Sequence, residues 1–272
     1  MDAFAVFGNP IKHSWSPRIY ALFADEIGLS HSYGLVLAPL TEFKKTLRRF
    51  FDAGGLGANI TSPFKESACL LCDHLSERGS LAGAVNTIKK QQNGLLFGDN
   101  TDGIGLFNDL QRLDLLCHDS RVLLVGAGGA ARGVILPLLA YGCKIVLTNR
   151  TFSRAQELAG LYHHISDITA QKSEYLDTFD YDLIINATSI GMSGGIPSLP
   201  TSIIRPEVCC YDMFYQKGDT PFIAWCRRQG AKRCADGLGM LVGQAAWAFL
   251  LWHGLLPSIS PVIETLRMEM SD

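Results

Sequence analysis

The chain has 272 residues, a formal net charge of −2 and a hydrophobic content of 47%, which is enough apolar material for two buried cores or one large one. The near-neutral charge provides no general attraction to nucleic acid or to an acidic membrane surface. The N-terminal stretch MDAFAVFGNP lacks the basic and apolar segments of a secretory signal, and the apolar segment 122–142 is interrupted by Arg132, Pro137 and glycines. We therefore predict a soluble, cytoplasmic protein without a membrane span.

The eight cysteines do not follow a pattern typical of a metal site. Cys69 and Cys72 form a C-x-x-C pair, but no second pair follows at zinc spacing, and the dipeptide His163-His164 is isolated. We therefore expect free thiols in a reducing compartment and no bound metal.

Strand-like and helix-like segments alternate in the first hundred residues. Ser16-Pro17 and Ser62-Pro63 both resemble helix starts, with serine as the N-cap and proline at the first helical position. Asn93-Gly94 separates two short runs and predicts a β-hairpin. The expected strands are 3–8, 33–38 and 57–61, and the expected helices run from 16 to the stop at Gly28 and around 43–51.

From about residue 103 the same alternation starts again. The expected strands are 121–126, 144–149, 181–188, 210–215 and 231–235, and the expected helices are 103–115, 130–141, 152–161 and 220–229. A long apolar helix over 238–256 and a final amphipathic helix complete the chain. Strands separated by helices indicate a parallel sheet with right-handed crossovers, so the expected fold class is α/β.

The segment GAGGAA, residues 126–131, follows a predicted strand and opens a predicted helix. It fits G-x-G-x-x-A, in which Gly126 permits a tight turn and Gly128 lets the backbone approach a pyrophosphate at the helix N-terminus. Ala131 allows close packing of helix on strand. The context predicts a dinucleotide site, and the alternative is a packing turn without a ligand.

The next strand ends in VLTNRTFSR, residues 146–154, where an NAD site usually carries an acid for the ribose 2′-hydroxyl. This chain has Arg150 and Arg154 instead, four residues apart at a helix start, with Asn149 and Thr151 as neutral donors. Arginine suits a phosphate, so the stretch favours NADP over NAD. The alternative is a pair of solvated surface arginines.

Two further polar clusters indicate a site for chemistry. If Ser62 caps a helix, Lys65 is its third residue, where a cation opposes the helix dipole. An unfavourable position of this kind for a charged lysine suits a general acid or base. Asp102 precedes the helix at 103 and either caps it or pairs with Lys65. The alternative for Lys65 is an exposed lysine with a small penalty.

Other polar residues suit a substrate rich in oxygen. Ser14 and Ser16 place two hydroxyls near a helix start, a suitable cradle for a carboxylate, although Ser16 also fits a simple cap. Asn86 and Gln244 stand in apolar surroundings and need hydrogen-bond partners. Those partners are either a polyhydroxylated substrate or other groups of the protein.

Taken together, these motifs resemble the shikimate dehydrogenase family over essentially the whole chain. The segments that carry the resemblance are GNPIKHSWSP (8–17), GANITSPFKE (57–66), LAGAVNT (81–87), GDNTDG (98–103), GAGGAARG (126–133), NRTFSRA (149–155), NATSIGM (186–192), YDMFY (211–215) and DGLGMLVGQAAWAF (236–249). Nine motifs in this order are specific, although no single one is decisive.

The resemblance implies NADPH-dependent reduction of 3-dehydroshikimate to shikimate, in the pathway to the aromatic amino acids. It implies a substrate domain over 1–102, a Rossmann-like NADP-binding domain over 103–237, and C-terminal helices over 238–272 that return to the first domain. The implied partners are a small-molecule substrate and NADP(H), without nucleic acid or membrane, in a monomer or homodimer. The alternatives are a quinate/shikimate dehydrogenase that also uses NAD, and a catalytically silent NADP-binding regulator.

The family's functional residues transfer to this chain position by position. Lys65 and Asp102 match its acid–base pair. The implied substrate contacts are Ser14, Ser16, Asn59, Thr61, Asn86, Tyr215 and Gln244, and the implied cofactor contacts are Glu77, Gly126, Ala127, Gly128, Gly129, Ala130, Asn149, Arg150, Thr151, Arg154, Met213 and Gly237. Trp15 and Trp247 depart from the family's usual residues. Trp15 removes no catalytic group, and no function is assigned to Trp247.

Overall fold

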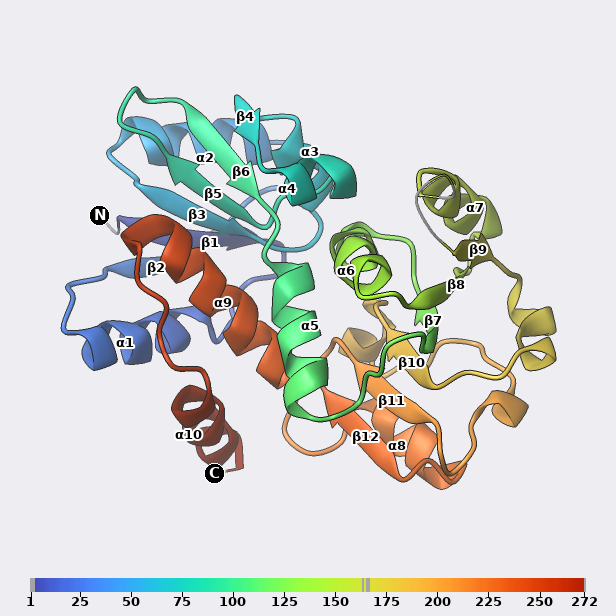
Figure 1. The fold of residues 1–272 in the computed structure, drawn as a ribbon. Coiled ribbons are helices and arrows are strands. Elements are labelled where there is room, and N and C mark those ends of the chain that lie inside the picture. The colour runs from blue at the N-terminus through green and yellow to red at the C-terminus, as the bar shows by residue number, and fades with distance from the viewer. Residues whose placement is uncertain (1–2, 163, 165–166, 272) are drawn as a thin grey trace.

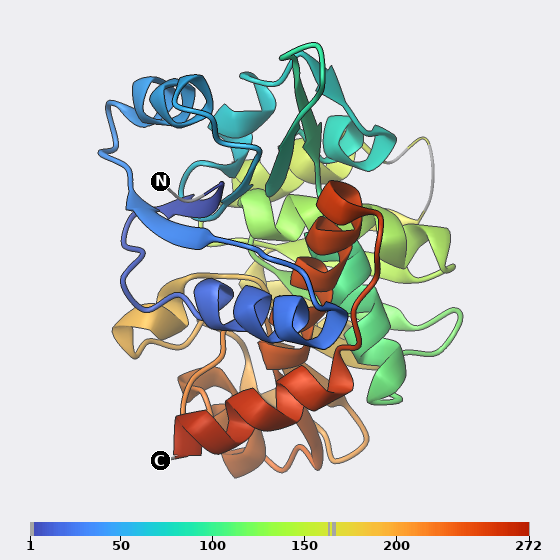
Figure 2. The same cartoon turned by 90° about the vertical axis from the view of Figure 1, so that its left-hand side faces the viewer.

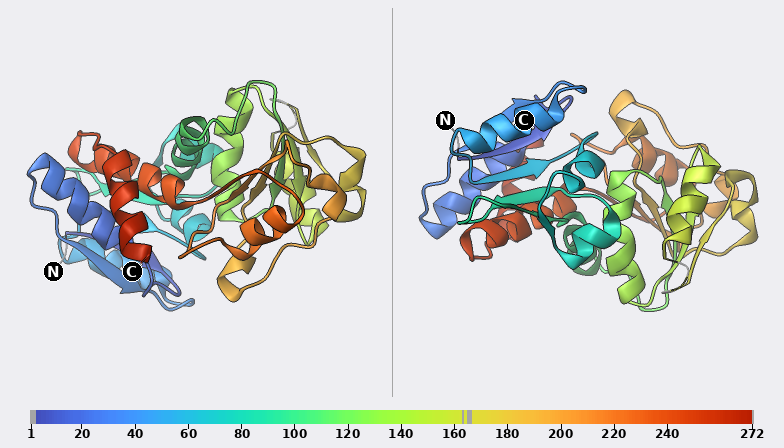
Figure 3. Two further views of the ribbon diagram at one scale, coloured as in Figure 1. Left: turned by 90° about the horizontal axis from the view of Figure 1, so that it is seen from below. Right: turned by 90° about the horizontal axis from the view of Figure 1, so that it is seen from above.

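Two six-stranded sheets, one from each half of the chain, form the framework of the protein (Figure 1). The computed structural model describes residues 3–162, 164 and 167–271. His163, part of the isolated histidine pair, therefore lies outside the described residues. Views from below and above show the two halves side by side, with the C-terminal helices against the first (Figure 3).

The first sheet is mixed, in the order β2-β1-β3-β5-β6-β4. Its strands are β1 (Phe4–Gly8), β2 (Tyr33–Leu37), β3 (Gly57–Ile60), β4 (His74–Leu75), β5 (Thr87–Lys90) and β6 (Leu96–Asp99). β1 runs parallel to β2 and β3, whereas β5 runs antiparallel to β3 and β6. The predicted hairpin is confirmed, because β5 and β6 pair around Asn93-Gly94 and Gly94 adopts a φ of +86°.

The helices of the first half are α1 (Ser16–Ile27), α2 (Phe43–Asp52), α3 (Lys65–Cys69) and α4 (Glu77–Ala82). The serine caps predicted at Ser16 and Ser62 are wrong. Ser16 is the first residue of α1, with Trp15 in the cap position, and its hydroxyl bonds elsewhere. At Ser62-Pro63, a cis peptide bond lies in a turn closed by the bond from the Phe64 N–H to the Thr61 carbonyl, so α3 begins only at Lys65.

The second sheet is entirely parallel, in the order β12-β11-β10-β7-β8-β9. Its strands are β7 (Arg121–Val125), β8 (Lys144–Thr148), β9 (Ile168–Ala170), β10 (Leu183–Asn186), β11 (Cys209–Asp212) and β12 (Arg233–Asp236). Two blocks of three strands extend outward from the β7–β10 pair, which is the strand order of the Rossmann fold. Sequence periodicity missed β9, a strand of three residues.

Helices α5 (Asp102–Arg112), α6 (Gly129–Ala140), α7 (Phe152–Gly160) and α8 (Pro221–Arg228) accompany the second sheet, with 3-10 turns at Ser173–Thr178, Ile190–Ser193 and Thr201–Ile203. The apolar segment 122–142 forms β7 and α6, as predicted. Over the described residues, no helix has both the length and the hydropathy needed to cross a bilayer.

The last two helices, α9 (Leu238–His253) and α10 (Ser260–Ser271), lie beside elements of the first half (Figure 2). One hydrophobic cluster joins Ile19 and Phe23 of α1 to Val242 and Phe249 of α9 and to α10. Helix α9 ends three residues earlier than predicted because Gly254 adopts a left-handed φ of +75°. The domain boundaries at 102 and 237 stay a prediction.

Helices α5 and α9 lie side by side where the two halves meet (Figure 1). Glycines form their contact. A Cβ added at Gly105 would lie 2.6 Å from the Gln244 backbone nitrogen and 2.9 Å from the Met240 carbonyl oxygen. On the opposite helix, a Cβ at Gly243 would lie 3.3 Å from the Gly105 Cα. The separation of the helices therefore depends on Gly105 in particular.

We expect Gly105→Ala to lower the free energy of unfolding by about 1–3 kcal/mol, because backbone atoms cannot move aside as a flexible side chain does. Gly243→Ala is the matched control: its contact is looser, and the gain in helix propensity of about 1 kcal/mol offsets it. Urea titration of both variants measures the difference. Equal losses in the two would contradict this account of the packing.

Candidate active site

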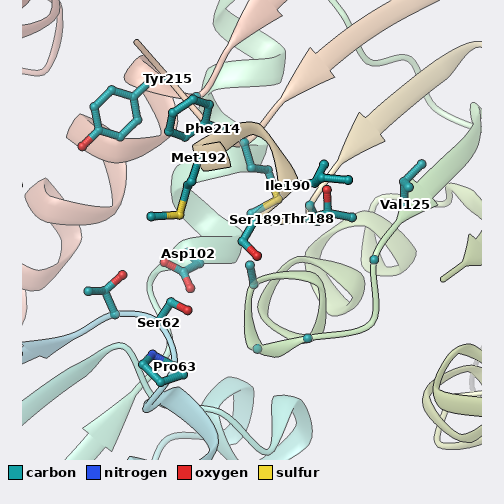
Figure 4. Close-up of a pocket in the computed structure, with 18 of the residues that line it drawn as sticks. Ser62, Pro63, Asp102, Val125, Thr188, Ser189, Ile190, Met192, Phe214 and Tyr215 are labelled. Atoms are coloured by element: carbon teal, nitrogen blue, oxygen red, sulfur yellow. The ribbon is translucent and has the colours of Figure 1, made fainter. Parts of the chain in front are cut away.

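A cavity of about 1580 Å³ lies between the carboxyl ends of the parallel strands of both sheets. The segments after β1 and β3 line it from the first half, and those after β7, β8, β10, β11 and β12 line it from the second. Open parallel sheets bind ligands at this edge because the connections there diverge. In Figure 4, Ser62 and Pro63 lie on one side, Thr188–Met192, Phe214 and Tyr215 on the other, and Asp102 between them.

Lys65 and Asp102 form an ion pair inside this cavity. The Lys65 Nζ lies 2.5 Å from the Asp102 Oδ2, and the two side chains are 15% and 6% exposed. Each residue is the first of its helix, α3 or α5, so Asp102 is not the N-cap, which is Thr101. The carboxylate faces Lys65 instead of capping. A Cβ at Gly129 would lie 3.2 Å from the Lys65 Cβ, which places the glycine turn against this pair.

Asn86 orients Asp102 from behind. Its amide nitrogen donates to the Asp102 Oδ1 at 2.8 Å and to the Thr101 hydroxyl at 2.9 Å, and lies 3.3 Å from the Gln244 Oε1. The Asn86 side-chain oxygen, Oδ1, accepts from the Thr101 N–H at 2.8 Å and from the Thr87 hydroxyl at 2.9 Å. The polar group that the sequence places in apolar surroundings is therefore satisfied within the protein.

Asn59 is also fully engaged by the protein. Its carbonyl oxygen accepts from the Tyr20 hydroxyl at 2.8 Å and the Tyr33 hydroxyl at 2.6 Å. Its side-chain nitrogen donates to the Thr87 hydroxyl at 3.1 Å and to the backbone carbonyl of Asn86 at 3.3 Å. All four hydrogen-bonding positions of the amide are used, so Asn59 braces strand ends at the cavity wall.

The two serines lie at the cavity wall with their hydroxyls in contact. The Ser14 hydroxyl donates to the Ser16 Oγ at 3.1 Å, and the Ser16 N–H donates to the Ser14 Oγ at 3.2 Å. Burial raises the pKa of the nearby Tyr215 hydroxyl to about 12, so that group stays protonated at neutral pH. Thr61, Tyr215 and Gln244 line the same cavity. These groups form a wall of hydroxyl and amide groups suited to a polar substrate.

The glycine turn presents its backbone to the cavity at the start of α6. Gly126 has a φ of +119°, and a Cβ there would lie 3.1 Å from the Ala187 backbone. At Gly128, an added Cβ meets no described atom within 4 Å. Open space therefore lies beside the backbone at the start of this twelve-residue helix, where a pyrophosphate would bind. Ala131, on the buried face of α6, is fully buried.

Arg150 and Arg154 follow β8, line the same cavity and are both exposed. The Asn149 amide donates to the Thr151 carbonyl at 2.9 Å and so holds the turn before α7. Within the described chain, neither guanidinium forms an ion pair with a carboxylate. Both cations are available to an anionic ligand.

All the predicted cofactor residues except Glu77 line the cavity. Met213, Gly237 and the segments 126–130 and 149–154 all contribute to the lining. Glu77, in contrast, is exposed on α4 and is not among the described residues that line the cavity. A cofactor contact at Glu77 therefore has no geometric support. It stands at a helix start, which is a common place for an acid in its own right.

Sequence reasoning missed two segments of the cavity lining. Lys172, Ser173 and Glu174 follow β9, and residues 187–199 follow β10. The signal for the second was available, because parallel strands that meet at one edge bring their following loops together. The first depends on β9, which is too short to show a period.

All eight cysteines are free thiols. Among the described residues, no group of three or more histidine, cysteine or acidic side chains is arranged to hold a metal ion.

The fold and the cavity define a class of two-domain α/β oxidoreductases with a Rossmann-like dinucleotide-binding half. Three family models match: the shikimate dehydrogenase substrate binding domain over residues 6–88, shikimate/quinate 5-dehydrogenase over 110–192, and the shikimate 5′-dehydrogenase C-terminal domain over 237–267. The chain belongs to the shikimate dehydrogenase family.

Solved structures agree over the whole length. An Ael1 enzyme from Pseudomonas putida is 40% identical, with 98% of each chain covered and a TM-score of 0.89. Shikimate 5-dehydrogenase from Thermus thermophilus, in complex with NADP(H) and shikimate, is 34% identical, with 97% of this chain and 98% of that chain covered and a TM-score of 0.86. The Listeria monocytogenes enzyme, in complex with shikimate and NAD, is 28% identical, with 97% and 95% covered and a TM-score of 0.84.

Proposed function

We propose that this protein catalyses the reversible NADPH-dependent reduction of 3-dehydroshikimate to shikimate. The observation that carries the proposal is the Lys65–Asp102 pair, which lies in one cavity with both the glycine turn and the serine pair. The complex of the Thermus thermophilus relative with NADP(H) and shikimate supports this choice of ligands.

The residues present suit a dinucleotide bound from the glycine turn to the arginines. The backbone of Gly126–Ala130 would hold the pyrophosphate, and Arg150 and Arg154 would hold a 2′-phosphate, with Asn149 and Thr151 as further donors. Met213 and Gly237, which also line the cavity, would lie toward the nicotinamide end. When bound, NADPH supplies the hydride that the ring carbonyl carbon accepts.

The chain's own groups would manage the charge and the proton. As the carbonyl oxygen gains negative charge, the Lys65 ammonium donates a proton to it, and Asp102 holds the ammonium in place. Asn86 keeps the Asp102 carboxylate turned toward Lys65. Ser14 and Ser16 would donate to the substrate carboxylate, while Thr61, Tyr215 and Gln244 would contact the oxygen substituents on its carbon ring.

Substrate and cofactor would be bound by different parts of the chain. Residues 1–102 and the returning helices over 238–272 would bind the substrate, and residues 103–237 would bind the cofactor. A cleft between two such units favours closure on binding, which excludes water from the hydride path.

The second candidate is a quinate/shikimate dehydrogenase that accepts NAD. The family model that matches residues 110–192 covers quinate enzymes, and the Listeria monocytogenes relative was solved with NAD. The two exposed arginines beyond β8 favour the first candidate, because an NAD site would be expected to carry an acid there.

Rates measured with all four combinations of NADP or NAD and shikimate or quinate test the proposal. We expect turnover of shikimate with NADP to exceed every other combination in kcat/KM. Efficient oxidation of quinate with NAD would replace the proposal by the second candidate. No shikimate-dependent change in NADPH absorbance would leave a cofactor-binding regulator as the remaining explanation.

Lys65→Ala tests the proposed proton donor. We expect kcat to fall by about 10²–10⁴, the usual contribution of a positioned acid–base group, while the KM for shikimate changes little. Lys44→Ala, which removes the same charge from the exposed face of α2, is the control and should retain its activity. A Lys65→Ala enzyme with nearly normal kcat would remove Lys65 from the mechanism.

Arg150→Asp tests the preference for NADP. An acid at this position repels a 2′-phosphate and accepts from a 2′-hydroxyl, so the KM for NADPH should rise by about tenfold or more while the use of NADH suffers little. Lys144→Asp changes the same charge at the other end of β8 and is the control. Equal losses with both cofactors would show that Arg150 acts on folding or on the shared part of the dinucleotide.

A further inference from the structure

The pairing of β9 with β8 places a third cation at the edge that carries the two arginines. The strands run parallel, with Leu147 opposite Ala170, and the Gln171 N–H donates to the Leu147 carbonyl at 2.9 Å. Extending this register by two residues brings Lys172 level with Asn149. Lys172 therefore leaves the sheet beside the turn that begins the Asn149–Arg154 segment.

The surroundings of Lys172 connect it to the same part of the cavity. Its side chain lines the cavity together with Arg150 and Arg154, and its Nζ lies 5.9 Å from the centroid of the Phe152 ring. Phe152 is the first residue of α7 and stands between the two arginines in the chain. The Lys172 side chain is 54% exposed, so its ammonium is free to turn toward a ligand.

Glu174 lies next to Lys172 and opposes this group of three cations. The Glu174 Oε1 lies 4.0 Å from the Lys172 Nζ, the carboxylate side chain is 62% exposed, and the residue also lines the cavity. A carboxylate at this point attracts the Lys172 ammonium away from a ligand and repels a phosphate. Glu174 therefore lowers the positive potential that Arg150, Arg154 and Lys172 create.

We propose that Lys172 is a specificity-determining contact for the 2′-phosphate of the dinucleotide, with Glu174 as the acid that limits its strength. The proposal rests on the proposed preference for NADP and adds to it a cation from a different strand. A 2′-phosphate carries up to two negative charges, so it benefits from the third cation, whereas a 2′-hydroxyl does not.

The size of the effect follows from exposure. An exposed charge contact in water changes a binding constant by about fivefold at most, and added salt screens it. The contribution of Lys172 should therefore be smaller than that of a buried or bidentate arginine, and it should shrink as ionic strength rises. Glu174 should act with the opposite sign and a similar or smaller size.

Titration calorimetry of the full chain with adenosine 2′,5′-bisphosphate and adenosine 5′-phosphate tests this directly, without turnover. We expect Lys172→Met to weaken binding of the bisphosphate by about three- to fivefold at low salt and to leave the monophosphate unchanged. Glu174→Gln should tighten the bisphosphate by about two- to threefold. Lys172→Arg, which keeps the charge, should retain most of the affinity for the bisphosphate. Lys144→Met, at the start of β8, should leave the affinities for both ligands unchanged.

The outcomes separate the inference from the proposed function. If the unmodified protein prefers the bisphosphate and Lys172→Met keeps that preference in full, the inference is wrong and the NADP assignment stands. If the unmodified protein binds both ligands equally, the NADP preference itself fails and the inference with it. Equal weakening of both ligands by Lys172→Met, with an unchanged melting temperature, would also overturn the inference, because it would show a contact shared by both ligands.

Discussion

The ion pair between Lys65 and Asp102 is the contact on which the arrangement of the site depends. A lysine and an aspartate at 15% and 6% exposure would each be costly alone, and their pairing at 2.5 Å makes both tolerable inside the cavity. The pair also joins the start of α3 to the start of α5, the helix that leads into the second half. The ion pair therefore fixes the start of α3 against the start of α5 inside the cavity.

A network of buried hydrogen bonds next to this pair holds the strand ends of the first sheet in place at the cavity wall. Asn59 and Asn86 lie in or beside strands of the first sheet, and their amides are bonded by Tyr20, Tyr33, Thr87 and Thr101. Satisfied buried amides resist rotation, because any rotation leaves a polar atom without a partner. The groups best placed to meet a ligand are the hydroxyls of the serine pair and Lys65 itself.

Beyond β8 the charged groups of the cavity are exposed and have no carboxylate partner among the described residues, in contrast to the buried Lys65–Asp102 pair. There the cations Arg150 and Arg154 are exposed and carry no ion pair within the described chain, so they cost little to maintain and stay available. The region around Lys65 is buried and prearranged, and the region around the arginines is open and adjustable. This contrast fits a ligand whose reacting part needs close placement and whose phosphate needs mainly charge.

The sequence by itself determined the α/β class, most elements, the glycine turn and the arginines beyond β8, because each depends on local periodicity or on a short motif. It also placed Lys65 and Asp102 near helix starts, although the serine cap assigned at Ser62 was wrong, because a turn delays α3 to Lys65. Only the tertiary structure decided that Asp102 faces Lys65 instead of capping α5, that Glu77 lies outside the described cavity lining, and that Lys172 joins the arginines. Those outcomes depend on which strand lies beside which, and strand pairing is set by contacts between residues far apart in the chain, for which local sequence carries no signal.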